Sequence, residues 1–195
     1  MNTFLAFGIV GTICSIFSSW IYIISILKGK TIPSRATWII GTISSAILFF
    51  SYYAEGARAT LGIPLNIFIT STIVLILSIK RGHEGWSHFD KMCFFVVLLS
   101  LLFWYLFNSP FIALIINLII DIVSTIPTVR KLFYLPHSED LAAWGVAVIG
   151  NLLNILAVEQ LRFGILVYPI VTFSINLIVT IIIIYNKRKF AIKNF

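Results

Sequence analysis

One acidic residue lies deep inside a long apolar segment of this sequence. Asp121 follows the mostly apolar residues 111–120, and the next basic residue after it is Arg130. A carboxylate at such a depth in a bilayer costs about 2.5–3.5 kcal/mol, so residues of this kind usually face a cavity or a partner. Asn117 lies four residues earlier and therefore on the same helical face. We interpret both as substrate-binding groups, with Asp121 either hydrogen-bonding a solute or carrying a proton coupled to it.

Three prolines inside apolar segments are candidates for hinges. Pro127 follows Asp121 by six residues, and Pro64 and Pro169 lie in the third and seventh apolar segments, 105 positions apart. Proline lacks the amide hydrogen that continues a helix and costs about 3 kcal/mol in a helix interior. We expect all three to act as gating hinges, and for Pro64 and Pro169 the alternative is a proline at the start of its helix.

Further amides and one indole complete the candidate binding set. An amide in hydrocarbon must find a hydrogen-bond partner, which is either another helix or a solute. The candidates are Asn66, Asn154 and Asn176 for hydrogen bonding, and Trp20, in the middle of the first apolar segment, for stacking on a sugar or heterocycle. Contacts between helices and ordinary packing are the alternative interpretations.

Neither a catalytic site nor a metal site is predicted. His83, His88 and His137 have no second metal ligand at helical spacing. Cys14 and Cys93 lie in separate apolar segments and are interpreted as small buried hydrophobic residues. The sequence contains no nucleophile–base motif and no phosphate-binding glycine loop. We therefore expect neither an enzyme nor a cofactor.

The composition indicates that these residues belong to a membrane protein. Of 195 residues, 59% are hydrophobic and only 11% are charged, whereas soluble domains carry about 25% charge. The net charge of +7 comes from short basic clusters beside the apolar segments, so it indicates membrane topology and not nucleic-acid binding. The first apolar segment, residues 4–27, is too long for a cleaved signal peptide, and we expect it to stay as a helix.

Seven apolar segments are predicted to cross the membrane, because each approaches the ~20 residues that span a bilayer. They cover residues 3–27, 37–54, 60–79, 91–107, 110–131, 141–158 and 161–185. Twelve Lys and Arg residues lie in the first, third and fifth connections and the tail, against two, Arg58 and Arg162, in the others. Because basic residues stay in the cytoplasm, we expect the N-terminus outside and the C-terminus inside a bacterial inner (plasma) membrane.

The two halves of the chain repeat one pattern. Each has a basic pair, a proline, a serine and a tryptophan before its second span, then a Glu-x-x-Arg joint, then a proline. The matching residues are Lys28, Lys30, Pro33, Ser34 and Trp38 with Arg130, Lys131, Pro136, Ser138 and Trp144, then Glu55 and Arg58 with Glu159 and Arg162, and Pro64 with Pro169. Matches in this order at a nearly constant offset indicate duplication of a three-helix unit. We interpret the tryptophans as interfacial and the joints as surface ion pairs, with an outer latch as the alternative.

Duplication of a three-helix unit requires an additional span, because a directly joined second copy would enter the membrane upside down. The predicted fold is therefore an all-α membrane protein of seven transmembrane helices, with two parallel three-helix bundles joined by an inversion linker helix. Residues 1–82 form the first bundle, 83–108 the linker loop and linker helix, and 109–195 the second bundle with its basic tail. Parallel repeats of this kind are one recurring transporter design, with the substrate site at the repeat interface.

The second half resembles the Pro-Gln-loop motif, in which a Pro-Gln dipeptide ends the first helix of a three-helix unit. The residues that carry the resemblance are Pro127-Thr128, Arg130-Lys131, Ser138-Glu139-Asp140 and Trp144, with Thr128 where glutamine is usual. Together with the seven-helix plan, they make the chain similar to the SWEET/Pro-Gln-loop (PQ-loop) superfamily. That group includes sugar facilitators, lysosomal amino-acid exporters and the PnuC-type vitamin-precursor branch. The resemblance implies a binding asparagine in spans three and seven, for which Asn66 and Asn176 are candidates.

The sequence thus predicts a membrane transporter, either a facilitator or a proton-coupled carrier, that works by alternating access between two bundles. Its substrate would be a small polar metabolite, and a sugar, an amino acid or a vitamin precursor all fit. The alternative is a receptor or accessory protein on the same scaffold with no net transport. The expected partners are the substrate and the lipid bilayer, with no nucleic acid, and a homo-oligomer is left open.

Overall fold

The computed structural model describes residues 3–29, 33, 35–81, 88–134 and 141–193, which form seven α-helices and no strand. The helices are α1 (Thr3–Leu27), α2 (Arg35–Ala54), α3 (Gly62–Arg81), α4 (His88–Phe107), α5 (Pro110–Tyr134), α6 (Leu141–Leu156) and α7 (Phe163–Lys193). Their number and order match the predicted segments. The largest difference is at α7, which continues eight residues beyond the expected end at position 185.

Local sequence signals explain where several helices stop and start. Gly29 and Gly56 follow α1 and α2 with φ angles of +68° and +95°, a backbone conformation that glycine adopts without steric cost. Asn108 takes a φ of +46° directly after α4. Pro110 then begins α5, where its missing amide hydrogen is not needed.

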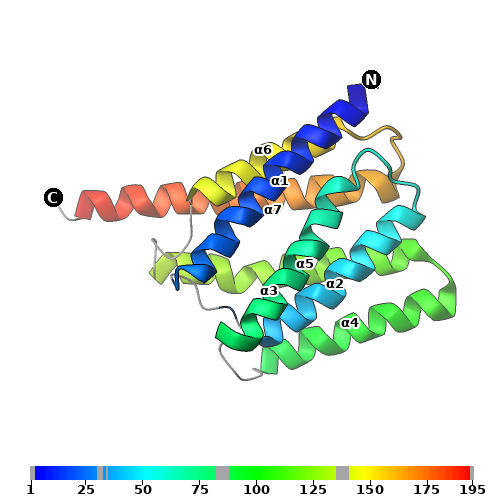
Figure 1. Ribbon diagram of the computed structural model, residues 1–195, viewed down its shortest axis with the longest axis horizontal. Helices are drawn as coiled ribbons and strands as arrows, with labels where there is room; N and C mark the ends of the chain where they lie inside the picture. Colours follow the sequence, from blue (N-terminus) through cyan, green and yellow to red (C-terminus); the bar gives the residue numbers. More distant parts are fainter. Residues whose placement is uncertain (1–2, 30–32, 34, 82–87, 135–140, 194–195) are drawn as a thin grey trace.

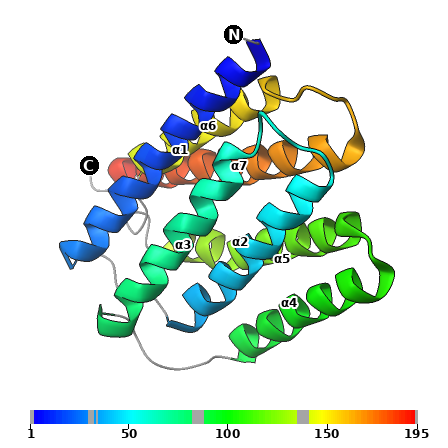
Figure 2. The ribbon, with the colours of Figure 1, turned by 45° about the vertical axis from the view of Figure 1, so that its right-hand side comes forward.

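Six of the helices form a closed ring. Around it, α1 packs on α3, α3 on α2, α2 on α5, α5 on α7, α7 on α6, and α6 on α1. In each half of the chain, the third helix of the triplet thus lies between the first and the second. The remaining helix, α4, lies outside the ring against α5 and α2, as Figures 1 and 2 show.

The ring has two ends that differ in their connections. At one end, residues 55–61 join α2 to α3 and residues 157–162 join α6 to α7; we call it the short-joint end, on the right of Figure 1. At the other end lie the first residues of α2 and α6 and the last residues of α1, α3 and α7. We call it the basic end, because Lys28, Arg35, Lys80 and Lys187 lie there.

The burial pattern is that of a protein surrounded by an apolar medium. Three stretches, Thr3–Leu27, Gly62–Lys80 and Phe163–Lys187, are long and apolar enough to cross a membrane. The shorter apolar helical stretches are Trp38–Ala54, Phe94–Phe107, Pro110–Val123 and Leu141–Leu156. Large hydrophobic side chains are exposed on every helix, whereas serines, threonines and asparagines are buried between helices. Soluble proteins rarely expose apolar surface on this scale, which indicates membrane association.

The three prolines have different positions. Pro64 is the third residue of α3, within the first turn, where helix amides have no partner. This position fits the alternative interpretation, a proline at the start of its helix, because no helical hydrogen bond is lost there. Pro169 is the seventh residue of α7 and lies inside that helix. Pro127 lies within α5, and its side chain is outside the described part of the structure.

Candidate functional site: a cavity between the two triplets

A cavity of about 360 Å³ lies among α1, α2, α3, α6 and α7. Its position between helices of both triplets matches the place where bundles commonly bind small molecules, and its volume is within the range of ligand sites. None of the described lining residues carries a charge. The lining consists of Ser18, Ser19, Tyr22, Trp38, Ile67, Thr70, Ser71, Ala143, Trp144, Ala147 and Asn176.

The α1 wall of the cavity is held in place by an asparagine behind it. The Nδ2 group of Asn66, on α3, donates to the hydroxyl oxygens of Ser15 and Ser19 at 2.8 and 2.9 Å. Its Oδ1 accepts from the Thr70 hydroxyl at 3.4 Å. Asn66 itself is buried. It therefore orients two cavity-lining hydroxyls, Ser19 and Thr70, from one layer behind the cavity surface.

Aromatic rings line the cavity on two sides. On one side, the rings of Tyr22 and Trp38 lie 5.7 Å apart at an interplanar angle of 42°. On the other, Trp144 lies near the start of α6, as Trp38 does near the start of α2. The interpretation of these two tryptophans as interfacial residues missed their place in the cavity. Two indole rings in the lining are groups on which a planar or ring-shaped solute can stack.

Asn176 contributes an amide on α7. Its Nδ2 donates to the carbonyl oxygen of Thr172 at 2.7 Å, and its side-chain oxygen accepts no hydrogen bond from the described residues. That oxygen can therefore accept from a solute. The Thr172 hydroxyl in turn donates to Oδ1 of Asn151 at 2.9 Å, which links α7 to α6 directly behind the cavity.

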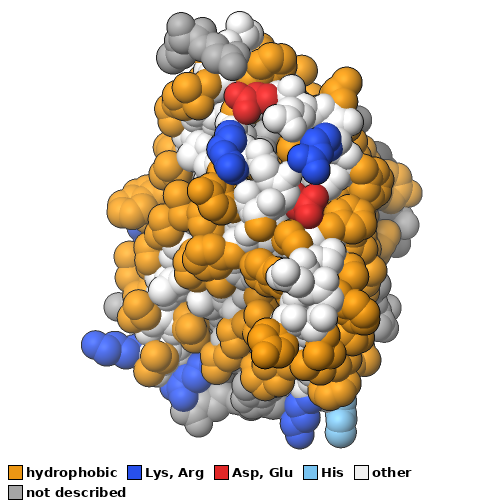
Figure 3. All heavy atoms as spheres, turned by 90° about the vertical axis from the view of Figure 1, so that its right-hand side faces the viewer, with side chains coloured by type: hydrophobic (Ala, Val, Ile, Leu, Met, Phe, Trp, Pro, Cys, Tyr) orange, Lys and Arg blue, Asp and Glu red, His pale blue; other side chains and the backbone are white. Residues whose placement is uncertain are grey.

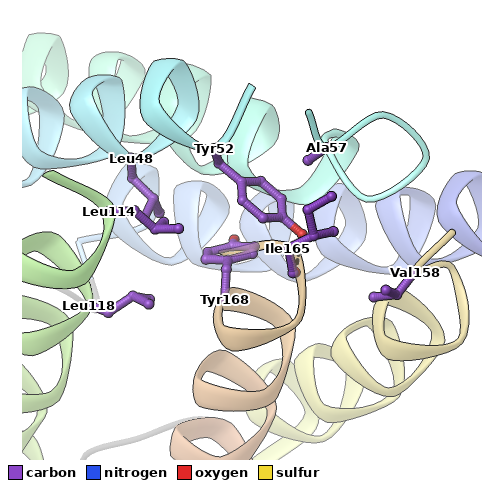
Figure 4. Packing of buried hydrophobic residues seen from close by; sticks show 8 residues of the cluster. All are labelled: Leu48, Tyr52, Ala57, Leu114, Leu118, Val158, Ile165 and Tyr168. Carbon is purple, nitrogen blue, oxygen red and sulfur yellow. Dashed lines mark hydrogen bonds between the residues drawn. The ribbon is translucent and has the colours of Figure 1, made fainter. Parts of the chain in front are cut away.

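Two tyrosines close the ring at the short-joint end. The Tyr52 and Tyr168 ring centroids lie 4.9 Å apart, both side chains are fully buried, and leucines of α5 pack against them (Figure 4). The Tyr52 hydroxyl donates to the carbonyl oxygen of Ile165 and shares a hydrogen bond with the Thr60 hydroxyl, both at 2.8 Å.

The acceptor of the Tyr52 hydrogen bond is explained by a proline. In a regular helix, the Ile165 carbonyl would accept from the amide of residue 169, but Pro169 has no amide hydrogen. The Tyr52 hydroxyl, from α2, supplies the missing hydrogen bond from the opposite triplet. Pro169 thus converts a helical hydrogen bond into a contact between the two halves of the chain.

Asn117 is placed away from the cavity. Its Oδ1 accepts from the Ser44 hydroxyl at 2.7 Å, and its Nδ2 lies 3.4 Å from the Ser100 hydroxyl and 2.8 Å from the Ala113 carbonyl oxygen. It is fully buried where α2, α4 and α5 meet. In this structure Asn117 joins helices, and α4 is held to the ring through it.

Asp121 and Trp20 do not line the cavity. Asp121 is partly buried, at helical spacing from Leu114 and Leu118, which pack in one cluster with Tyr168. Its side chain therefore continues the stripe of α5 that faces α7. Trp20 is 59% exposed on the outer surface of α1.

The charged joints contact each other across the short-joint end. Figure 3 views this end, where basic and acidic side chains gather on a largely hydrophobic face. The Glu55 carboxylate lies against Gly164, the second residue of α7, and a methyl group on Gly56 would lie 3.8 Å from Nη1 of Arg162.

Among the described residues, neither Glu-x-x-Arg motif forms an ion pair, so that interpretation is wrong. Arg58 instead donates to the carbonyl oxygens of Tyr53 and Ala57 at 3.2 and 2.7 Å, and its Cζ lies 4.6 Å from the centroid of the Tyr53 ring. Backbone carbonyls and an aromatic face were closer partners than the glutamate three residues earlier.

Sequence reasoning missed most of the hydroxyl groups at the site. Four polar residues of α1 are separated by three, one and three positions, so they lie on one face of the helix: Ser15, Ser18, Ser19 and Tyr22. This spacing in an otherwise apolar helix was the signal that could have identified the α1 wall. The described residues contain no group of three or more His, Cys, Asp or Glu side chains that could hold a metal ion.

Comparison of the chain with known protein families, with curated proteins and with solved structures finds no match.

Proposed function

We propose that this protein is a seven-helix membrane transporter whose cavity binds a small, neutral, polar solute. One observation carries the proposal: the cavity lies between two triplets of helices, and its described lining has hydroxyls, an amide and two indoles but no charged residue. Hydroxyl and amide groups can replace the hydrogen bonds that a sugar or vitamin precursor makes to water, and indole faces can stack on its ring.

The contacts between helices support two related triplets. The first helix of each triplet packs on the second helix of the other, α1 on α6 and α5 on α2, and the third helix lies centrally in both. Such exchange is what a two-fold axis along the membrane normal would produce. The seven-span arrangement with α4 as the linker, and the resemblance to the SWEET/PQ-loop superfamily, are part of this proposal. The basic end would then face the cytoplasm.

Alternating access would follow from the difference between the two ends. In this structure the cavity lies toward the basic end, since Trp38 and Trp144 are near the starts of their helices. The tyrosine pair fills the ring at the short-joint end. A second conformation, with the basic end closed and the short-joint end open, would complete a transport cycle if the two differed by a few kcal/mol.

A neutral solute is favoured over an amino acid. The ammonium and carboxylate groups of a zwitterion need charged or strongly polar partners when they leave water. None of the described cavity residues provides a charge. We therefore expect binding of sugars, polyols, nucleosides or vitamin-ring compounds, and weaker binding of amino acids.

A thermal-shift screen of these compound classes on purified protein is the first test, because a ligand of the folded state raises apparent stability with concentration. Compounds that raise the melting temperature are then offered to proteoliposomes as labelled solutes. Uptake supports the proposal. Binding without flux would replace it by the receptor interpretation.

The pH dependence of uptake by the wild type and by the Asp121→Asn variant distinguishes a facilitator from a proton-coupled carrier. For a coupled carrier we expect uptake by the wild type to depend on pH and the Asp121→Asn variant to lose that dependence. For a facilitator we expect uptake that is independent of pH in both. Measuring initial uptake rates at several pH values, without a proton gradient and with one, distinguishes these two cases.

A further inference from the structure

Two buried polar side chains have no hydrogen-bond partner among the described residues. They are Asn154 on α6, which is 1% exposed with neither its Nδ2 nor its Oδ1 paired, and Tyr168 on α7, which is fully buried with its hydroxyl unpaired. Buried polar groups are almost always paired, because an unpaired one has lost its hydrogen bonds to water without replacement. Two such groups in neighbouring helices need an explanation.

Asn154 lies on a helical stripe that begins at the cavity. Four residues of α6 are separated by three, four and three positions and so share one face of the helix: Trp144, Ala147, Asn151 and Asn154. Trp144 and Ala147 line the cavity. The stripe therefore leads from the cavity through Asn151 to Asn154, toward the short-joint end.

Tyr168 lies on the matching stripe of α7. Asn176, Thr172 and Tyr168 follow at intervals of four residues, and Asn176 lines the cavity. The two stripes meet where the Thr172 hydroxyl donates to Oδ1 of Asn151 at 2.9 Å. Both unpaired groups lie one helical turn beyond that hydrogen bond, on its short-joint side.

The closure beyond them rests on few groups. Tyr52 packs on the Tyr168 ring, and its hydroxyl donates to the Ile165 carbonyl that Pro169 leaves without a helical partner. This hydrogen bond joins α2 of the first triplet to α7 of the second. If the two triplets separated at the short-joint end, it would be the contact that breaks.

We propose that Asn154 and Tyr168 are solute-contacting residues in the closed half of the route, and that the Tyr52–Ile165 hydrogen bond is the latch that closes it. This inference rests on the proposed function. An amide that can donate and accept, next to a phenol hydroxyl, suits the same neutral polar solutes as the cavity. The two groups are unpaired in the closed form because their partner is the solute or water that enters when the latch opens.

Cysteine accessibility tests this inference without any solute. The reporter variant is Asn154→Cys in a Cys14→Ala, Cys93→Ala background. It is treated with a charged, membrane-impermeant methanethiosulfonate reagent in intact cells and in inside-out vesicles, so that each side of the membrane is tested. Leu152→Cys is the matched control, because residue 152 lies two positions away and is 46% exposed on the outer surface of α6. Ala157→Cys, at the first residue after α6 and three positions beyond Asn154, is a second reporter should Asn154→Cys fail to fold.

We expect the reagent to modify the reporter from the face where Arg58 and Arg162 lie. Adding Tyr52→Phe should speed that modification by about tenfold, because the latch loses one hydrogen bond. The Leu152→Cys rate should stay unchanged. The inference is overturned if the reporter reacts no faster than Leu152→Cys, both with and without Tyr52→Phe.

The two proposals can fail separately. If the reporter is modified as expected but the protein moves no solute, the proposed latch is supported and the proposed transport function is contradicted. If the wild type takes up solute but the reporter behaves like the Leu152→Cys control, the transport function is supported and the proposed route past Asn154 and Tyr168 is contradicted.

Discussion

At the scale of single residues, the account depends on which polar groups satisfy one another and which do not. Pro169 shows this most clearly, because its missing amide hydrogen leaves the Ile165 carbonyl for Tyr52, which lies 113 positions before Ile165 in the chain. The sequence alone identified Pro169 as a helix interruption. It could not identify Tyr52 as the donor, since that pairing depends on how α2 and α7 pack.

Tyr52→Phe should lower the free energy of unfolding by about 1–3 kcal/mol, because the Ile165 carbonyl then stays buried without a donor. Adding Pro169→Ala should recover part of this loss, because residue 169 regains an amide that can donate to Ile165. Thermal unfolding of the two single variants and the double variant measures the coupling. Tyr53→Phe, at a side chain that is 51% exposed, is the control. Additive effects of the two changes would contradict the assigned hydrogen bond.

Asn117→Leu tests whether Asn117 joins helices, as the structure places it. Its loss leaves the Ser44 hydroxyl without its acceptor and removes the contact to Ser100, whose hydroxyl still donates to the Val97 carbonyl oxygen. We expect a lower melting temperature, equivalent to about 1–3 kcal/mol. Removing all three polar groups, with Ser44→Ala and Ser100→Ala added, should restore part of the stability. Ile119→Leu on the exposed face of the same helix is the control. Unchanged stability with abolished uptake would instead return Asn117 to the binding site.

At the scale of helices, close approach of backbones decides the packing between the two triplets. A methyl group on Gly11 would lie 2.8 Å from the carbonyl oxygen of Gly150, so α1 and α6 cross with almost no side chain between them. Small residues permit such crossings in membrane proteins, where packing and not the hydrophobic effect drives helix association. The helices themselves were predictable from apolar composition, whereas this crossing was not.

Gly11→Ala should therefore destabilise the protein by about 1–3 kcal/mol, the usual cost of inserting a group into a tightly packed contact. Gly145→Ala is a matched control, because a methyl group there would contact nothing within 4 Å. Alanine at that position should be neutral or slightly stabilising, since alanine favours a helix over glycine by about 1 kcal/mol. Equal melting temperatures for the two variants would disprove the close crossing.

The candidate site was only partly predictable, for a physical reason. Periodicity shows that Asn176 shares a helix face with Thr172, but not whether that face meets a cavity, a helix or lipid. Trp20 and Trp38 illustrate the difference: Trp20 lies in the middle of α1 and is exposed outward, whereas Trp38 lies near a helix end and lines the cavity. The rotation of each helix about its own axis decides whether its tryptophan faces outward or lines the cavity.

At the scale of the whole molecule, six helices enclose apolar clusters together with buried serine, threonine and asparagine side chains, and large hydrophobic side chains cover the exterior. The repeat in the sequence predicts two related triplets, and the ring of contacts, with α1 on α6 and α5 on α2, supports that relation. A ring of this kind provides one interface between halves at each end. In the proposed transport cycle, one end would open while the other closes, without a change inside either triplet.

The most direct test of the account is whether a neutral solute crosses the membrane through this cavity. Labelled hexose, polyol, nucleoside and vitamin-ring compounds are offered to proteoliposomes containing the wild type, Asn176→Leu, or Ile178→Leu, the last altering an exposed side chain two residues away. We expect uptake of at least one compound by the wild type, about a tenfold lower rate for Asn176→Leu because one solute hydrogen bond is lost, and an unchanged rate for Ile178→Leu. Uptake of none of these compounds, or equal rates for the two variants, would contradict the account.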